Sequence, residues 1–525
     1  MTILNFFLWI VCHIIPVRLL DYLSNYSLPK SRSSFITFSR IHPSLFEYIS
    51  SRKMLYMFKR AAKLVPAYRN FLIQSGIDPL TIKNMADFRL KIPHTSKKNY
   101  VQCFSLKDRC YYGRFPSMGM LEESSGTTCA STTWLKSKAE EENQMAITAT
   151  SMRFLYGFEN RDQYIVINGL MLGGWSGGIR FASRFENLGI VKNIGPDPRK
   201  IIQCLKELGP EFTYLIGGYP PFIVEMIEFG KRLTDFDWSE FKIHILACGE
   251  GFTEGWRDYV ASQLKPGALI YSDYGAIDLD VGISVETPFS VIIKKLVTKD
   301  PVLRNHLFSS ERIPCFIGQY SPLQFNICES VNENAVKELE ITVLNLKTIA
   351  PNIKYAIGDE GGILRFQDIC EALERQGYSI TKMNLPAIIP FPFLYVYGRS
   401  DGTVTVNGAL ISPSEIQEAL LADPELVKAI HTFRLSVESD PENNIRLFIF
   451  VELRKDEQIT EELSARCNHE IIKGLLSSNE CFRINYEKNQ ASTKPIVSLV
   501  PYHTGIFMKN TERIKQNYLK QVNNE

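Results

Sequence analysis

The sequence has almost no excess charge of either sign, and this excludes a nucleic-acid partner held by general electrostatics. Its 59 Lys and Arg residues nearly balance its 57 Asp and Glu residues, which leaves a net charge of +2. Proteins that bind nucleic acid usually carry a basic excess on one face. A local basic groove is still compatible with this balance, but we predict no nucleic-acid partner.

The cysteines have no regular spacing. There are eleven, an odd number, and no C-x-x-C pair occurs. Disulfide frameworks and compact zinc sites both need recurring pairs. We therefore predict buried thiols in a reducing compartment, and a cytoplasmic location.

No apolar run is long enough to predict a membrane-spanning helix. Residues 1–20 are apolar almost throughout, but Asn5, His13 and Pro16 interrupt them. A spanning helix needs about 20 apolar residues, and a signal peptide needs a basic residue ahead of its apolar stretch, whereas the first one here is Arg18. Three interpretations stay open: a buried or partner-covered helix, a helix in contact with a membrane, and a cleaved signal.

Several catalytic signatures are also missing. The sequence contains no G-x-x-x-x-G-K-[ST] loop and no H-E-x-x-H pair. The glycines between 173 and 178 do not form a dinucleotide fingerprint. P-loop, zincin and Rossmann chemistries therefore have no support.

What is present is typical of a large globular protein. Hydrophobic residues make up 45% and charged residues 22% of 525 residues, and this length predicts two to four domains. From about residue 100 to 395, short β-rich runs such as 164–167, 214–216 and 243–247 alternate with helical patterns. This alternation predicts an α/β fold with buried sheets.

Composition and turn signals divide the chain into three parts. Residues 1–90 are predicted to be a helical segment packed on, or preceding, a large domain over 91–397. A polar turn at 398–402 precedes a small α+β domain over 398–525. Within this domain, Ser412 and Glu415 form a predicted capping box around Pro413 at the first helical position.

A hydroxyl-rich bend is the most informative local pattern. It consists of Ser124, Ser125, Gly126, Thr127 and Thr128. Small side chains let backbone N–H groups approach an anion, and hydroxyls add donors without bulk. The bend is therefore a candidate polyphosphate cradle, and the alternative is a surface Ser/Thr loop.

Four more motifs follow in a fixed order. They are Cys248-Gly249-Glu250-Gly251, the stretch 271–278, the stretch 355–359 and the stretch 398–401. Together they resemble the adenylate-forming superfamily of acyl-CoA ligases, nonribosomal adenylation domains and luciferases. The phenylacetate–CoA ligase branch and its capsule-biosynthesis relatives are the most similar, because residues 92–97 and 169–178 also match that branch. The resemblance runs from about residue 85 to 425, and more weakly to the end.

The resemblance implies a large multi-sheet α/β domain, a small mobile C-terminal α+β domain, and a two-step reaction. A carboxylic acid attacks the α-phosphate of ATP, with Mg²⁺ present, and gives an acyl-adenylate and pyrophosphate. The acyl group then passes to a thiol, commonly that of coenzyme A. Three alternatives stay open: a carrier-protein thiol, an amine or hydroxyl acceptor, and a degenerate nucleotide-binding protein without turnover.

The resemblance also implies roles for individual residues in holding ATP. The hydroxyl-rich bend would hold the phosphates. Gly249, Glu250 and Gly251 would line the adenine. Tyr274, followed by Gly275, would face the base, Asp359 would accept the ribose hydroxyls, and Arg399 would reach the ribose or phosphate. A core role for Tyr274, a turn role for Asp359 and a surface ion pair for Arg399 are the structural alternatives.

The metal, hinge, tail and acid-binding residues follow by the same resemblance. Asp278 stands where the family has Glu, near Mg²⁺, and Asp401 occupies the hinge. The family's catalytic lysine near the C-terminus has no clear equivalent, so Lys509, Arg513 and Lys515 are the candidates. Trp175, Gly177 and Tyr219 are predicted to line the acid pocket.

Overall fold

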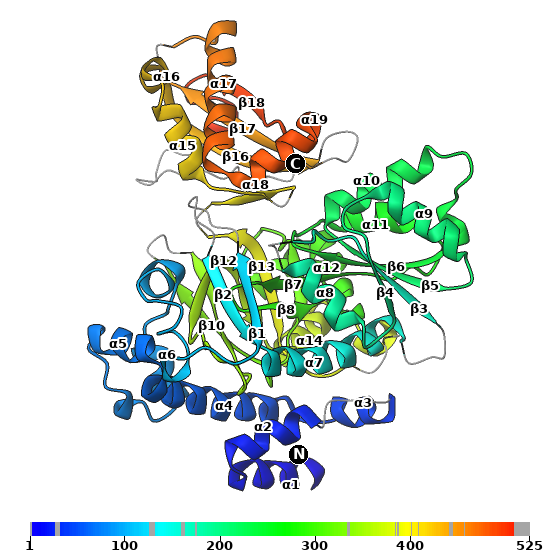
Figure 1. Cartoon of the computed structure of the whole chain (residues 1–525), viewed down its shortest axis with the longest axis vertical. Helices are drawn as coiled ribbons and strands as arrows, with labels where there is room; N and C mark the ends of the chain where they lie inside the picture. The colour runs from blue at the N-terminus through cyan, green and yellow to red at the C-terminus, as the bar shows by residue number, and fades with distance from the viewer. Residues whose placement is uncertain are drawn as a thin grey trace. The chain divides into compact units, whose positions relative to one another are not determined.

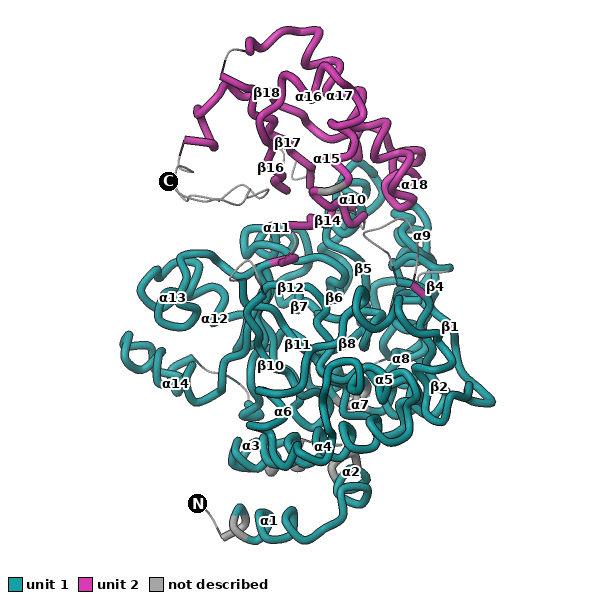
Figure 2. The backbone as a smooth tube through the Cα atoms, turned by 90° about the vertical axis from the view of Figure 1, so that its left-hand side faces the viewer, with its two compact units in different colours: residues 1–124, 133–397 teal, residues 125–132, 398–525 magenta. Residues whose placement is uncertain are grey.

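The computed structural model describes most of the chain. The described residues are 3–26, 32–124, 132–158, 163–173, 176–332, 336–383, 385, 388–400, 402–407, 409–439, 445–455 and 457–508. The chain forms two compact units, residues 1–124 with 133–397 and residues 125–132 with 398–525 (Figure 2). The helical N-terminal segment lies within the first unit, and the division into three parts stays a prediction.

An eleven-stranded sheet runs through the first unit. Its strands follow the order β10 (Phe325–Val331), β11 (Lys337–Val343), β12 (Tyr355–Leu364), β13 (Phe393–Arg399), β9 (Phe316–Gln319), β8 (Asp280–Val285), β7 (Ile270–Ala276), β6 (Lys242–Cys248), β5 (Thr213–Gly218), β3 (Tyr164–Asn168) and β4 (Ile190–Asn193). Neighbours from β4 to β7 are parallel, and β8 pairs antiparallel with β7. The predicted α/β class is confirmed.

Helices cover both faces of the parallel part of the sheet. The helices α9 (Pro198–Leu208), α10 (Pro220–Lys231) and α11 (Glu254–Gln263) pack on the face that carries Ile216 and Ile245. On the other face, α7 (Lys138–Tyr156) and α8 (Gly177–Phe185) pack over Leu215 and Leu246. Strands β3 and β5 are therefore buried at every position, as expected of parallel strands covered on both sides.

Two further hydrophobic cores lie against the remaining strands of the sheet, one on each face. On one face lie α12 (Pro288–Lys299), α13 (Pro301–Phe308) and α14 (Phe366–Arg375), packed against β9 and β13. On the other, α4 (Pro43–Leu64) and α5 (Pro66–Gln74) pack against β10–β12, where Met57 and Phe58 join Ile327 and Ile341. The shorter elements of this unit are α6 (Met85–Lys91), β1 (Gly119–Ser124), β2 (Thr132–Ser137), η1 (Pro79–Thr81), η2 (Lys97–Val101), η3 (Tyr111–Gly113), η4 (Trp238–Glu240) and η5 (Ile380–Met383).

The first helices are α1 (Ile3–Ile14), α2 (Val17–Tyr26) and α3 (Arg32–Ser39). Helices α1 and α2 lie along the outer side of α4, and α3 lies beyond its end (Figure 1). The buried Lys53 of α4 holds this layer, because its Nζ pairs with Asp21 of α2 at 2.5 Å and donates to the Leu323 carbonyl at 2.6 Å. Within the described residues, no helix is both long enough and apolar enough to pass through a bilayer.

The second unit has its own core around a three-stranded sheet. Strands β16 (Ile430–Ser439) and β17 (Ile445–Leu453) are antiparallel, and β18 (Ile496–Val500) runs parallel to β17. The other elements are β14 (Val404–Val406), β15 (Ala409–Ile411), α15 (Pro413–Leu421), α16 (Pro424–Ala429), α17 (Glu461–Ser478), α18 (Glu480–Lys488), α19 (Gln490–Thr493) and η6 (Gly505–Phe507). The capping box predicted at Ser412 and Glu415 is present at the start of α15.

Candidate functional site

Two of the predicted nucleotide residues meet in the first unit. The Tyr274 hydroxyl on β7 donates a hydrogen bond to Asp359 Oδ2 on β12, with a distance of 2.6 Å between residues 85 positions apart. Both side chains are half-buried, and the Tyr274 ring lies 5.7 Å from that of Phe316. An aromatic face and a carboxylate therefore lie side by side, as recognition of a base and a ribose requires.

The strand that carries Tyr274 is packed too tightly for a side chain at the next position. A Cβ atom at Gly275 would lie 2.3 Å from the Val281 carbonyl carbon on β8. Glycine here lets the β7 and β8 backbones approach, and that approach fixes the strand beside Tyr274. The predicted glycine thus has a packing reason within the first unit.

The loop after β6 is shaped by two glycines. Gly249 has φ +90°, a left-handed conformation that glycine adopts without strain. A Cβ atom at Gly251 would lie 2.8 Å from the Cys315 Sγ atom. Glu250 between them is half-buried. The loop therefore follows a path that side chains at positions 249 and 251 would disturb.

The Asp278 carboxylate lies in a network of hydrogen bonds. Its Oδ2 atom accepts a hydrogen bond from the Tyr355 hydroxyl at 2.9 Å and pairs with Lys97 Nζ at 3.4 Å. The same Lys97 Nζ donates to Ser124 Oγ at 3.1 Å, and Trp134 Nε1 donates to that oxygen at 2.8 Å. Lys97 thus connects the metal candidate to the first residue of the hydroxyl-rich bend.

These donors fit a metal ion only in part. Mg²⁺ is commonly held by one or two carboxylates together with substrate phosphates and water. Asp278 supplies one carboxylate, and the described residues contain no group of three acidic, His or Cys side chains able to hold a metal ion. A magnesium ion at this position would have to take its other ligands from ATP and water.

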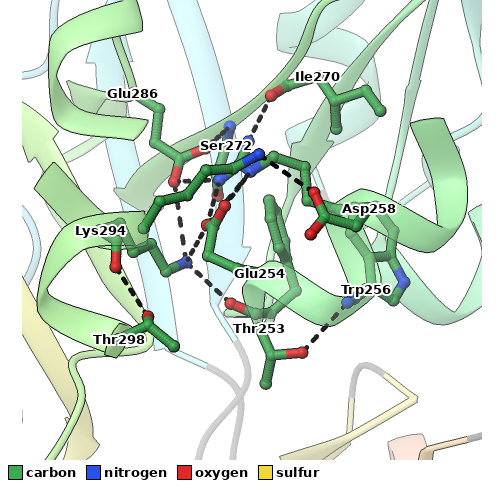
Figure 3. Close-up of polar contacts among 12 residues, drawn as sticks. Thr253, Glu254, Trp256, Asp258, Ile270, Ser272, Glu286, Lys294 and Thr298 are labelled. Atoms are coloured by element: carbon green, nitrogen blue, oxygen red, sulfur yellow. Dashed lines mark hydrogen bonds and ion pairs between the residues drawn. The ribbon is translucent and has the colours of Figure 1, made fainter. Parts of the chain in front are cut away.

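A buried network of four charges supports the loop after β6 (Figure 3). Arg257 pairs with Glu254 at 3.0 Å and with Glu286 at 2.7 Å. Lys294 donates to the carbonyls of Phe252 and Cys315, each at 2.8 Å. Because Phe252 follows Gly251 in sequence and Cys315 lies beside it in space, this network supports the wall of the loop after β6.

The network also reaches β7, where Glu286 Oε2 accepts a hydrogen bond from the backbone N–H of Ser272 at 2.7 Å. Arg257 donates to the carbonyl of Ile270 on the same strand. The loop after β6 and the strand of Tyr274 are therefore fixed by one set of side chains.

Other predicted site residues lie in separate places. Gly177 begins α8, and Tyr219 precedes α10 with its ring 6.1 Å from Phe222. Arg399 ends β13 and is grouped with the second unit, so its contact with a nucleotide stays a prediction. Ser125, Gly126, Thr127, Thr128, Trp175, Asp401, Lys509, Arg513 and Lys515 lie outside the described residues.

Six residues of this region were not predicted as ligands or partners. Lys97 appeared only within a matching motif, and Tyr355 only as the start of the Asp359 stretch. The buried charges at 254, 257, 286 and 294 carry no local signal, because they come from α11, from the end of β8 and from α12. Only the arrangement of the sheet brings these side chains together.

No family model matches the chain. Its sequence is similar to curated phenylacetate–coenzyme A ligases. That of Thermus thermophilus is 24% identical, over 72% of this chain and 74% of the relative. That of Escherichia coli is 24% identical over 71% and 75%, and that of Pseudomonas putida is 23% identical over 73% and 77%.

Among solved structures, the fold is similar to that of a 2-hydroxyisobutyryl-CoA ligase in complex with 2-HIB-AMP and CoA. The TM-score is 0.56 at 15% identity, over 92% of this chain and 91% of that one. An open conformation of the same ligase gives a TM-score of 0.50. The predicted resemblance to this superfamily and branch is confirmed.

Proposed function

We propose that this chain, a relative of the phenylacetate–coenzyme A ligases with the fold of an adenylate-forming CoA ligase, activates a carboxylic acid with ATP and transfers the acyl group to coenzyme A. The observation that carries the proposal is the hydrogen bond between Tyr274 and Asp359. It joins two stretches from distant parts of the chain that the resemblance assigns to nucleotide binding. The sequence similarity supplies the reaction class.

In the first step, Tyr274 would lie against adenine and Asp359 would accept the ribose hydroxyls. The hydroxyl-rich bend would donate to the phosphates as charge develops there. Lys97 would compensate the Asp278 carboxylate, from which it lies 3.4 Å. Mg²⁺, when bound with ATP, would neutralise phosphate charge beside Asp278.

The first step is tested by acid-dependent exchange of labelled pyrophosphate into ATP. We expect exchange with at least one member of a panel of carboxylic acids, and none without an acid. No exchange with any acid, from protein that binds ATP, would favour the alternative of a nucleotide-binding protein without turnover.

The acceptor is tested by AMP release once an active acid is known. Coenzyme A, a phosphopantetheine carrier protein, amines and alcohols are compared at equal concentration. Faster AMP release with coenzyme A, together with a thioester product, supports the proposal. Release driven by an amine or alcohol instead would make the chain an amide or ester synthetase.

We also propose that the first two helices contact an anionic membrane surface. Large apolar side chains of α1 and α2 are exposed, including Phe7 at 63%, Ile14 at 77% and Tyr22 at 64%. Residues 1–44 contain four Lys or Arg and one acidic residue, and that acid, Asp21, is paired with Lys53. Exposed apolar and aromatic groups beside net positive charge are typical of interfacial helices.

Flotation with phosphatidylserine-containing vesicles tests this contact. The full chain is expected to float with the vesicles, and a Phe7→Gln, Ile14→Gln variant to remain in solution. Equal flotation of both proteins, or no flotation of either, would exclude the contact. Equal pyrophosphate exchange by the two proteins checks that the substitutions leave the first unit intact.

A further inference from the structure

Asp273 lies on the opposite side of β7 from the nucleotide residues. It precedes Tyr274, and successive side chains of a strand point to opposite faces. The residue that pairs with Asp273 on the neighbouring strand β6 is Cys248. The Cys248 side chain packs with the core under α7 and α8. Cys248 is the last residue of β6, and Asp273 is the last residue of β7 that pairs with it in parallel; ligands bind beyond the carboxyl ends of parallel strands in open α/β sheets.

Asp273 and Arg184 converge on one point above Gly282. A Cβ atom built on Gly282 would lie 3.5 Å from Arg184 Nη1 and 3.8 and 4.0 Å from the two Asp273 oxygens. These three atoms are its nearest neighbours outside the adjoining residues. Because residue 282 is glycine, a guanidinium and a carboxyl group face a position that its own side chain does not occupy.

Both groups have unsatisfied hydrogen-bonding atoms. Arg184 is 4% exposed, and within the described part of the chain its Nε and Nη2 atoms have no hydrogen-bond acceptor, although Nη2 lies 3.7 Å from Glu141. Asp273 is half-buried, and its Oδ1 atom, which is itself buried, has no donor there. The Arg184 guanidinium is held in place by an ion pair with Asp280 at 2.9 Å. Buried polar atoms without partners usually indicate a bound group or water.

The surrounding charges decide which chemical group fits. Ion pairs connect Arg180 and Arg184 with Glu122, Glu141 and Asp280, and a separate pair joins Lys136 to Glu140. Of these charges, Arg184 and Asp280 act on Asp273. Another carboxylate would therefore enter a cluster that already has an acidic excess. An ammonium group would lie beside the Arg184 guanidinium, which repels it.

A neutral hydroxyl adds no charge to this cluster and is able to bond to both groups. Its oxygen accepts a hydrogen bond from Arg184, and the hydroxyl also exchanges a hydrogen bond with Asp273. Burial raises the pKa of Asp273 to about 8, so near neutral pH the carboxyl group carries its proton and is able to donate or accept.

We propose that Arg184, Asp273 and Gly282 form a polar subsite that selects a carboxylic acid with an uncharged hydroxyl substituent over the same acid without it. This inference rests on the proposed adenylation function and names its substrate class. Arg184 and Asp273 would be specificity-determining residues, with no part in the attack on ATP.

The test compares matched acids in the pyrophosphate-exchange assay. The pairs are phenylacetate with its 3- and 4-hydroxy derivatives, benzoate with its hydroxy derivatives, and hexanoate with 6-hydroxyhexanoate. Carboxymethyl and aminomethyl derivatives form two further arms. We expect at least one hydroxy acid to exceed its parent by about tenfold in kcat/KM, the worth of one buried hydrogen bond.

Two variants locate the effect. Gly282→Ala puts a methyl group at the convergence point with contacts of ordinary length, and Asp273→Ala removes one partner. Each should abolish the preference for the hydroxy acid and leave exchange with the parent acid within about threefold of wild type. Asp258→Ala, which removes an exposed acid on α11, is the matched control and should keep the preference.

The outcomes separate the two proposals. Exchange that favours parent, carboxylated or aminated acids, or a hydroxyl preference that survives Gly282→Ala, would overturn the subsite and leave adenylation intact. Absence of exchange with every acid would overturn the proposed function itself. If Asp273→Ala fails to fold, Gly282→Ala alone decides the matter, and its melting temperature shows that it is folded.

Discussion

At the scale of single residues, the site depends on pairs rather than on isolated ligands. Tyr274 and Asp359 were each predicted from a motif, but their mutual hydrogen bond was not. A motif gives the type of residue and its place in the chain. It does not give the strand order that brings β7 and β12 near enough for a 2.6 Å contact.

Asp359→Ala should weaken ATP binding more than Tyr274→Phe does. The first removes an ionised acceptor, and hydrogen bonds to charged groups contribute about 1.5–3 kcal/mol, so the KM for ATP should rise by about 10- to 100-fold. The second removes one hydroxyl and keeps the ring, for an expected rise of about two- to tenfold. Steady-state exchange kinetics measure both, and an unchanged KM in Asp359→Ala would exclude Asp359 from nucleotide binding.

The pKa of Asp273 gives a prediction for stability. Desolvation raises this pKa from 3.8 to about 8 in the folded chain. Between these values the unfolded chain loses this proton and the folded chain keeps it, so the contribution of Asp273 to stability falls as pH rises through that window. Asn at this position is neutral at every pH.

Urea unfolding at pH 5 and pH 7.5 measures this difference. The wild-type chain should lose more stability over this interval than Asp273→Asn, which keeps the other titrating groups. An equal loss in both proteins would show that Asp273 is ionised in the folded chain.

At the scale of secondary-structure elements, the sequence predicts well the features that depend only on neighbouring residues. The capping box at Ser412 and the short β-rich runs that form β3, β5 and β6 depend on residues within a few positions of each other. The charge network of Figure 3 does not, because it combines α11, β8 and α12. Its residues look in sequence like ordinary surface charges.

Glu286→Gln should therefore destabilise the first unit strongly. Glu286 is fully buried and pairs with Arg257, and removing one partner of a buried ion pair leaves an uncompensated charge at a cost of about 3–5 kcal/mol. Denaturant unfolding measures the loss. Lys295→Ala, which breaks the neighbouring exposed pair with Asp258, is the control and should cost under about 1 kcal/mol.

If Glu286→Gln lowered the free energy of unfolding by no more than Lys295→Ala does, we would conclude that water reaches the charge network in solution. A tight network also predicts a functional effect: the KM for ATP should rise in the folded fraction of Glu286→Gln, because the loop that contains Glu250 loses its support.

At the scale of the whole molecule, the order of motifs predicts the α/β fold and its superfamily, and the comparisons confirm both. The order of the eleven strands was not predicted, because pairing between distant strands leaves no periodic signal in one sequence. The same reason hid Lys97, which lies far from Asp278 along the chain and 3.4 Å from it in space.

In the C-terminal tail, no lysine matches the position of the family's catalytic lysine, so the sequence defines this part of the site least. Lys509→Ala or Lys515→Ala should lower the adenylation rate by tenfold or more, about 1.4 kcal/mol in barrier. The exposed Lys494 provides the control, because Lys494→Ala changes one charge on the same unit. Unchanged exchange in the Lys509, Lys515 and Arg513→Ala variants would remove the tail from the mechanism.

The packing of α4 has a consequence for how the chain is made. Its Lys53 bonds to a carbonyl 270 residues later, and its apolar side chains join a core with β10 and β11. During translation, this helix leaves the ribosome long before those strands exist. Until they emerge, its apolar face has no permanent neighbour, and such nascent surfaces are where chaperones bind and aggregation begins. Ribosome-bound chains that stop before residue 325 should therefore depend on chaperones more than chains that extend past residue 345.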